Sequence, residues 1–241
     1  MRLDARLAQA ATDRGRLDMG IGLFLSGYII GSIPSAEIAA RWLKRIDLRS
    51  IGSGTVSGTG VYYHVAWWAV LPVGLFDITK AALPTWLGLQ LGLGLPTALA
   101  GGLAAVIGHN WPLYLGFKGG RGLSPFMGVL LVVFPWGFSW LLLSLAVGRL
   151  LGATAIGALL GLALLPLLTW ATGQPAATTW ACLGMLVITL VKRVEANRLP
   201  LPAVPAERRQ VLLRRLFLDR DVAPQAAWIH RESVGGKGAK T

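Results

Sequence analysis

Charged residues are scarce in this sequence. Asp, Glu, Lys and Arg make up 14% of its 241 residues, whereas a soluble domain usually has about 25%. Hydrophobic residues make up 54%, and the mean hydropathy is +0.59. Long apolar stretches recur, several of them sufficient to cross a hydrocarbon core roughly 30 Å thick. The alternating segments of a membrane β-barrel are absent. The composition therefore excludes an ordinary soluble domain and predicts an all-α, polytopic integral membrane helical bundle.

Cysteine and histidine are also few. The single cysteine, Cys182, lies in an apolar run and excludes an internal disulfide. The histidines His64, His109 and His230 belong to no Cys/His cluster and no HExxH motif, so neither a metal nor a cofactor is expected. None of them has an Asp five residues later, which excludes the HxxxxD acyltransferase pattern. No GxSxG nucleophile elbow occurs in a strand–turn–helix context.

Acidic residues are outnumbered by basic ones. Eleven Asp and Glu stand against 23 Lys and Arg, which gives a net charge of +12. Because the cations mostly flank the apolar runs, they indicate contact with anionic lipid headgroups rather than with nucleic acid.

Six apolar stretches predict membrane spans, at about residues 20–42, 65–95, 96–112, 123–147, 150–170 and 176–191. The cations of the loop 43–63, of the segment 116–122 and of the C-terminal tail place all three on the cytoplasmic side. Six spans would put the first loop and the tail on opposite sides. We therefore expect one apolar stretch to be split, bent or re-entrant.

The sequence divides into three parts. Residues 1–19 form a polar N-terminal extension that does not resemble a signal peptide, and Met19 is a candidate translation start. Residues 20–198 form the membrane domain, and residues 199–241 form a basic cytoplasmic tail. The tail stretch RRQVLLRRLFLDR (208–220) predicts a helix on an anionic membrane surface or a short solvated helix, followed by a disordered GGKGAKT end.

Three polar segments carry the candidate site. The first, GSGTVSGTG (52–60), alternates glycines with small hydroxyl residues. Its backbone N–H groups can form an anion-binding nest, to which the hydroxyls add donors. A flexible interhelical loop is the alternative.

The second segment is GHNWPLYLGFKGGRG (108–122). Lys118 and Arg121 supply charge and the neighbouring glycines allow close backbone approach, which together suit a phosphate. His109 and Asn110 lie just before, and polar side chains within a span are usually functional. The spacing differs from a Walker A motif. A positive-inside turn that holds the topology is the alternative.

The third segment, KRVEANR (192–198), follows the last apolar run. Basic residues that anchor a span end are the alternative explanation for it. Asp77 and Lys80 lie three positions apart within apolar sequence, and they are candidates for the wall of the site or for an internal ion pair.

Together, GSIPSAEIAARWLKRIDLRSIGSGTVSGTGV (31–61), DITKA (77–81) and GHNWPLYLGFKGGRG (108–122) resemble the bacterial acyl-phosphate-dependent glycerol-3-phosphate acyltransferases. The resemblance covers most of residues 20–198. It implies an integral enzyme of the bacterial inner membrane, with seven spans and with its motifs facing the cytoplasm. It also implies transfer of a fatty acyl group from acyl phosphate to the sn-1 hydroxyl of glycerol 3-phosphate, giving lysophosphatidic acid for phospholipid synthesis.

The same resemblance implies residue roles. Ser53 matches the active serine of the family, and Ser53, His109 and Glu195 are the expected catalytic residues. Other matching positions are expected to bind the two phosphorylated substrates: Gly52, Gly54, Thr55, Thr59, Asp77, Lys80, Asn110, Lys118, Gly119, Gly120, Arg121, Gly122, Arg193 and Asn197. Because acyl phosphate is already activated, positioning and charge stabilisation can supply most of the catalysis.

The sequence departs from the family pattern in two motifs. Thr55 and Gly60 replace asparagines, Tyr63 replaces an arginine, Arg193 takes the place of a histidine, and Asn197 lies one position late. Two alternatives therefore stay open: a divergent member that binds acyl phosphate or lipid without catalysis, and an acyltransferase with a different phosphorylated acceptor. A transporter is a weaker alternative, because few ionisable residues lie deep in the apolar runs.

Overall fold

The computed structural model describes residues 2–51, 54–198 and 200–222. Its α-helices are α1 (Arg2–Gly31), α2 (Ser35–Lys44), α3 (Gly58–His64), α4 (Val70–Gln90), α5 (Leu95–Asn110), α6 (Leu123–Val133), α7 (Pro135–Leu150), α8 (Thr154–Ala171), α9 (Ala176–Glu195) and α10 (Pro205–Leu218). The short 3-10 helices are η1 (Leu48–Ser50), η2 (Trp67–Ala69), η3 (Leu113–Leu115) and η4 (Ala196–Arg198). The predicted all-α fold is confirmed.

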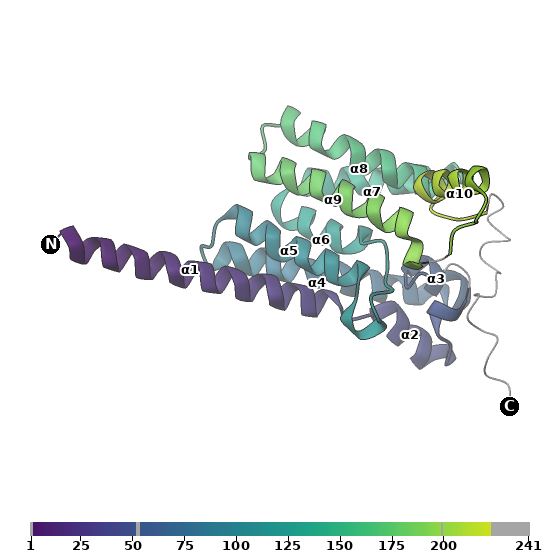
Figure 1. Ribbon diagram of the computed structural model, residues 1–241, viewed down its shortest axis with the longest axis horizontal. Coiled ribbons are helices and arrows are strands. Elements are labelled where there is room, and N and C mark those ends of the chain that lie inside the picture. Colours follow the sequence, from purple (N-terminus) through teal and green to yellow (C-terminus); the bar gives the residue numbers. More distant parts are fainter. Residues whose placement is uncertain (1, 52–53, 199, 223–241) are drawn as a thin grey trace.

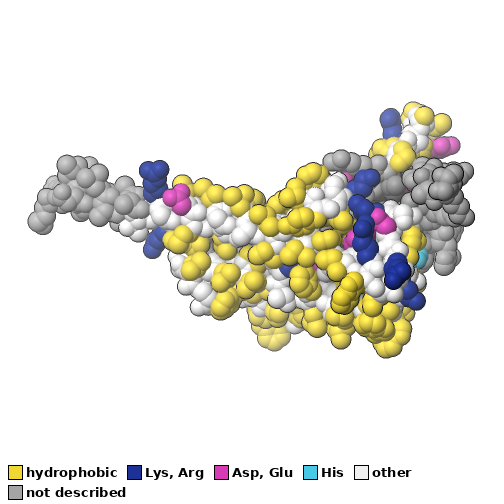
Figure 2. Space-filling model, turned by 90° about the horizontal axis from the view of Figure 1, so that it is seen from below, with side chains coloured by type: hydrophobic (Ala, Val, Ile, Leu, Met, Phe, Trp, Pro, Cys, Tyr) yellow, Lys and Arg dark blue, Asp and Glu magenta, His cyan; other side chains and the backbone are white. Residues whose placement is uncertain are grey.

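The long helices lie alongside one another as a bundle. Figure 1 shows α1 and α4 to α9 in this bundle, with the start of α1 projecting from one end. The opposite end carries α2, α3, α10 and the end of α9, and we call it the loop end. In Figure 2 the body of the molecule is largely hydrophobic, and most of the visible Lys and Arg side chains gather at the loop end.

Three segments of the described chain are long and apolar enough to cross a membrane: Thr12–Lys44, Thr154–Ala171 and Ala176–Glu195. The helix α4 lies within the predicted stretch 65–95, and α5 begins one residue before the predicted stretch 96–112 and ends inside it. The helix α1 continues across Met19, so no break in structure accompanies that predicted boundary. In the tail, α10 covers most of the expected helical stretch 208–220 but begins three residues earlier, and GGKGAKT lies outside the described residues.

One predicted span is split, as the charge distribution requires. The stretch 123–147 divides at Phe134, whose backbone is not helical, with φ −152° and ψ 74°. Pro135 explains the break, because it has no N–H and disfavours a helical conformation in the residue before it. With 11 residues, α6 rises only about 16 Å. That is roughly half of a hydrocarbon core.

The first predicted span also breaks. Instead of continuing to residue 42, α1 ends at Gly31, and α2 begins at Ser35 after Pro34. On α2, Ala36, Glu37 and Ala40 are buried. The break leaves the backbone carbonyl of Ile33 outside both helices, where a side chain from α4 reaches it.

Small residues let the helix backbones approach closely. On α1, Gly27 faces the carbonyl of Gly101, and Gly31 faces the carbonyl of Ala105 on α5. A Cβ atom at either glycine would collide with the α5 backbone. Close packing through small residues is typical of helices in membranes, where van der Waals contact largely replaces the hydrophobic effect.

The buried apolar side chains form two clusters. The larger lies within the bundle and includes Phe126, Leu130, Leu141, Leu165 and Met185. The smaller lies at the loop end and joins α2, η1, α3 and the start of α4: Ala36, Ala40, Leu48, Val56, Val61, Val65, Ala69, Val73 and Leu115. The second cluster gives the polar loops a packed base that is separate from the bundle.

We expect Gly27→Ala to destabilise the protein, because the added methyl must push α1 away from α5. Overpacking of this kind costs about 1–3 kcal/mol. The matched control is Gly22→Ala on the same helix, where a Cβ atom would meet nothing within 4 Å. Thermal unfolding in detergent should show a lower Tm for Gly27→Ala alone. Equal Tm values for the two variants would contradict the described packing.

Candidate active site

A buried ion pair lies where α4 approaches the break between α1 and α2. The Lys80 ammonium is 2.7 Å from the Asp77 carboxylate and 2.9 Å from Nδ1 of His109 on α5. It also donates to the carbonyl of Ile33 at 3.2 Å. The Ser35 hydroxyl donates to Asp77 at 2.7 Å. The spacing of three residues thus forms the predicted internal pair, which in addition holds a histidine in place.

These contacts orient the His109 ring. Nδ1 of His109 lies 2.9 Å from the Lys80 ammonium, which can only donate, and 3.6 Å from the Asp77 carboxylate. The closer contact with Lys80 favours a neutral ring that carries its proton on Nε2. Nε2 lies on the side of Gly120, where a Cβ atom would collide with it. His109 therefore presents a hydrogen-bond donor toward the glycine-rich segment 118–122, which we call the KGGRG loop.

The KGGRG loop folds back over the end of α5. The N–H of Gly120 donates to the carbonyl of His109 at 3.1 Å, and the N–H of Phe117 donates to that of Pro112 at 2.9 Å. A Cβ atom at Gly119 would collide with the His109 carbonyl and with the Pro112 ring. The chain needs glycine at 119 and 120 because the two backbone segments are in direct contact.

Asn197 joins the three motifs. Its side-chain amide donates to the carbonyl of Gly54 at 3.0 Å and to that of Gly119 at 3.1 Å. One side chain from the third motif thus holds the GSGTVSGTG segment (52–60) against the KGGRG loop. Gly52 and Ser53 lie outside the described residues. The described residue next to the expected catalytic serine is Gly54.

Glu195 is held by two groups. The Lys192 ammonium lies 2.9 Å from its carboxylate, and the Trp111 indole N–H donates to the same oxygen at 3.0 Å. The ammonium also lies 4.8 Å from the centre of the Trp111 ring, within the range of a cation–π contact. Lys192 is fully buried. The third motif therefore contributes a buried cation and a carboxylate next to the end of α5.

Arg193 is not brought together with these residues. Its guanidinium donates to the carbonyls of Ala155 and Leu216, each at 2.8 Å, and so ties α9 to α8 and α10. Lys192 points to the site instead, and the sequence analysis missed it. The signal was present: Lys192 and Glu195 are three residues apart and share a helix face, whereas Arg193 is turned about 100° away.

The other predicted residues fall into two groups. Lys118 and Thr59 are exposed at the loop end. Thr55 and Asn110 are buried, and neither polar atom of the Asn110 amide has a hydrogen-bond partner within the described chain. The Asn110 amide lies against Gly122, whose φ of +73° favours glycine. An unpaired buried amide is costly, so Asn110 is available to a ligand or a water molecule.

The entry to the GSGTVSGTG segment is fixed by Asp47. Its carboxylate accepts from the backbone N–H of Arg49 at 2.8 Å and lies 2.6 Å from the Arg49 guanidinium. The hydrogen bond from the Arg49 side chain, with that from its backbone, lowers the pKa of Asp47 to about 2. The loop between α2 and α3 is thereby anchored just before Gly52.

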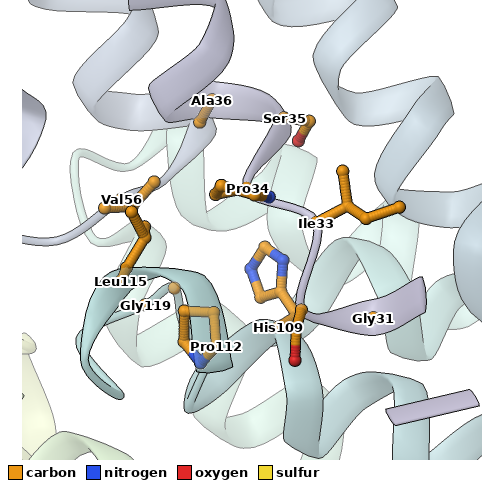
Figure 3. Close-up of a pocket in the computed structure, with 12 residues that line it drawn as sticks. Gly31, Ile33, Pro34, Ser35, Ala36, Val56, His109, Pro112, Leu115 and Gly119 are labelled. Carbon is orange, nitrogen blue, oxygen red and sulfur yellow. The ribbon is translucent and has the colours of Figure 1, made fainter. Parts of the chain in front are cut away.

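A small pocket lies where the first two motifs meet. It encloses about 210 Å³, including its opening to solvent. Figure 3 shows the His109 ring at its centre, between Pro34 and Pro112. The lining comes from the α1–α2 break, the first loop and the KGGRG loop: Gly31, Ser32, Ile33, Pro34, Ser35, Ala36, Val56, His109, Pro112, Leu115, Gly119 and Gly120. The polar side chains in this lining are those of Ser32, Ser35 and His109.

The family model for glycerol-3-phosphate acyltransferase matches residues 21–199, which contain all three motifs. This chain belongs to that family. The family assignment confirms the resemblance seen in the sequence. It leaves α10 outside the matched region.

Several curated relatives of this acyltransferase-family chain carry the same description. Glycerol-3-phosphate acyltransferase 4 of Dehalococcoides mccartyi (strain CBDB1) is 32% identical over 221 residues, covering 88% of this chain and 94% of the relative. The glycerol-3-phosphate acyltransferase of Parasynechococcus marenigrum (strain WH8102) is 37% identical over 181 residues, covering 73% and 84%.

A solved structure is also similar. The crystal structure of PlsY, an integral membrane glycerol 3-phosphate acyltransferase, in its glycerol 3-phosphate form has a TM-score of 0.67 and 26% identity. The match covers 73% of this chain and 89% of PlsY. A lysophosphatidic acid form of the same protein matches with a TM-score of 0.64. This member of the family is accordingly a membrane protein.

We expect Gly120→Ala to abolish most of the activity, because the new Cβ would displace Nε2 of His109 from the pocket. A misplacement of about 1 Å at a catalytic group can cost roughly 100-fold in rate. Gly74→Ala on α4 is the control, since a Cβ atom there meets nothing within 4 Å. Initial rates of both variants against the unmodified chain test the prediction, and a fully active Gly120→Ala would show that His109 is misassigned.

Proposed function

We propose that this chain transfers a fatty acyl group from acyl phosphate to the sn-1 hydroxyl of glycerol 3-phosphate, giving lysophosphatidic acid for phospholipid synthesis. Family membership, the curated relatives and the similarity to PlsY support this activity. The observation that carries it for this chain is the convergence of the three motifs. Asn197 bonds to both glycine-rich segments, and His109 faces the pocket between them.

The loop end suits two phosphorylated molecules. It offers the exposed ammonium of Lys118 and the unpaired amide of Asn110 beside the pocket lined by Gly119 and Gly120. A phosphate is well served by such fixed donors, because charge-assisted hydrogen bonds are about twice as strong as neutral ones. The fatty chain of the donor would lie along the apolar helices.

The reaction requires little covalent chemistry from the protein. The acceptor hydroxyl adds to the acyl carbonyl, the bond from that carbon to the phosphate oxygen breaks, and inorganic phosphate leaves with the electron pair. The hydroxyl proton passes to a basic group or to the departing phosphate. We assign Ser53 and Glu195 to positioning the hydroxyl and moving this proton, and His109 to stabilising the oxyanion. Donors such as the His109 Nε2–H stabilise the oxyanion.

We also propose that the protein lies in the bacterial inner membrane with the loop end facing the cytoplasm. The concentration of Lys and Arg at that end supports this orientation (Figure 2). The division of the stretch 123–147 into α6 and α7 supports an odd number of passes. Seven passes, with α1 and α4 to α9 as the crossing helices, would put the first loop and the tail on the same side.

We expect Lys118→Ala and Ser53→Ala to lower the rate by about 10-fold and about 100-fold respectively. The first loses a charged hydrogen bond to phosphate and the second a catalytic group. Lys44→Ala, which removes another exposed lysine at the end of α2, should keep the full rate. The measurement is phosphate release from palmitoyl phosphate by the purified protein with glycerol 3-phosphate.

The same assay separates the alternatives. Phosphate release with another polyol phosphate, but not with glycerol 3-phosphate, would show that this other compound is the acceptor. Tight binding of palmitoyl phosphate without release for any acceptor would make the chain a binding protein. Unchanged rates in both variants would show that the site lies elsewhere.

A further inference from the structure

The KGGRG loop has a partner outside the family region. Arg121 forms an ion pair with Asp219: its Nε lies 2.8 Å from the carboxylate oxygen, a charge contact without the alignment of a hydrogen bond. On its other side, the guanidinium donates to the carbonyl of Lys192 at 2.9 Å. The family match ends at residue 199, so the carboxylate that faces this loop comes from the tail.

The tail is built to hold Asp219 in place. Arg215 on α10 is buried and donates to the carbonyls of Val194 and Pro200, each at 3.3 Å, and its Nε lies 2.7 Å from the carboxylate of Asp221. The Leu216 carbonyl of α10 accepts from Arg193, as described above. The last turn of α10 is therefore fixed to the end of α9 by two arginines, one from each helix.

The end of α10 directs the carboxylate. Asp219 caps the helix in the left-handed conformation, with φ 54° and ψ 35°, and its N–H donates to the Arg215 carbonyl. Its side chain is 23% exposed and that of Arg121 is 12% exposed. A pair shielded from water to this extent holds its geometry better than a fully exposed pair, which contributes little.

We propose that Asp219 is a positioning residue of the active site, acting through Arg121. The Arg121 side chain forms a brace between the tail and α9, and this brace fixes the KGGRG loop so that Gly119 and Gly120 meet His109 at the pocket. The pocket lining includes both glycines but not Arg121. Because its guanidinium is already engaged by Asp219 and by the Lys192 carbonyl, Arg121 acts on the loop. This inference rests on the proposed phosphate-binding role of the loop.

The kinetic test is Asp219→Asn in the full chain, compared with Glu207→Gln, which removes one carboxylate from the exposed first turn of the same helix. We expect Asp219→Asn to raise the KM for glycerol 3-phosphate or palmitoyl phosphate about tenfold with little change in kcat. Asp219→Glu should restore most of the affinity, and Glu207→Gln should match the unmodified chain. Arg121→Gln combined with Asp219→Asn should be no worse than the more damaging single change, because both break one pair.

A structural readout accompanies the kinetics. Hydrogen–deuterium exchange of the purified protein should be faster over residues 117–122 in Asp219→Asn than in Glu207→Gln, with the bundle helices unchanged. An inactive unmodified chain would overturn the proposed function itself. With an active one, unchanged KM and exchange, additive double-mutant losses, or a gain in activity would overturn the positioning role alone. A gain would show instead that the tail restrains the enzyme.

Discussion

The buried ammonium of Lys80 is the interaction on which the rest of the site depends. In one place it contacts a carboxylate from α4, an imidazole from α5 and a backbone carbonyl from the break between α1 and α2. A charge inside an apolar bundle is tolerated only when such partners surround it. The break at Ser32–Pro34 supplies the carbonyl, and Ser35 completes the carboxylate's contacts. The ion pair therefore fixes how three helical elements meet and which way His109 faces.

The rest of the site is assembled by backbone contact around that centre. The KGGRG loop rests on the His109 carbonyl, and Asn197 ties it to the first glycine-rich segment. Each of these contacts needs either a residue without Cβ or a side chain that can donate to two carbonyls. This geometry suits a site that acts mainly by positioning its substrates and by fixed dipoles.

Much of this was readable from the sequence, because it depends on local spacing. Hydropathy predicted the helical membrane bundle, and the charge distribution called for one stretch to be split, bent or re-entrant. The i, i+3 spacing offered an ion pair of Asp77 and Lys80 as one of two alternatives. The residue assignments that were wrong or missing depended on helix phase and on contacts between distant parts of the chain. Arg193 faces α8 and α10 while Lys192 faces the site, and no local pattern links Asp219 to Arg121 across 98 positions. Ser53 lies outside the described residues, so its role stays a prediction.

The short helix α6 has a consequence for the surrounding lipid. At about 16 Å it is much shorter than the hydrocarbon thickness it would have to match. Hydrophobic mismatch of this kind is relieved by local thinning of the bilayer or by tilting of neighbouring helices, at a cost of a fraction of a kcal/mol per Å. In the proposed seven-pass arrangement, α6 is largely covered by its neighbours, so the helices around it would have to tilt or the membrane beside them to thin. The stability of the protein should in turn depend on the acyl-chain length of the lipids that surround it.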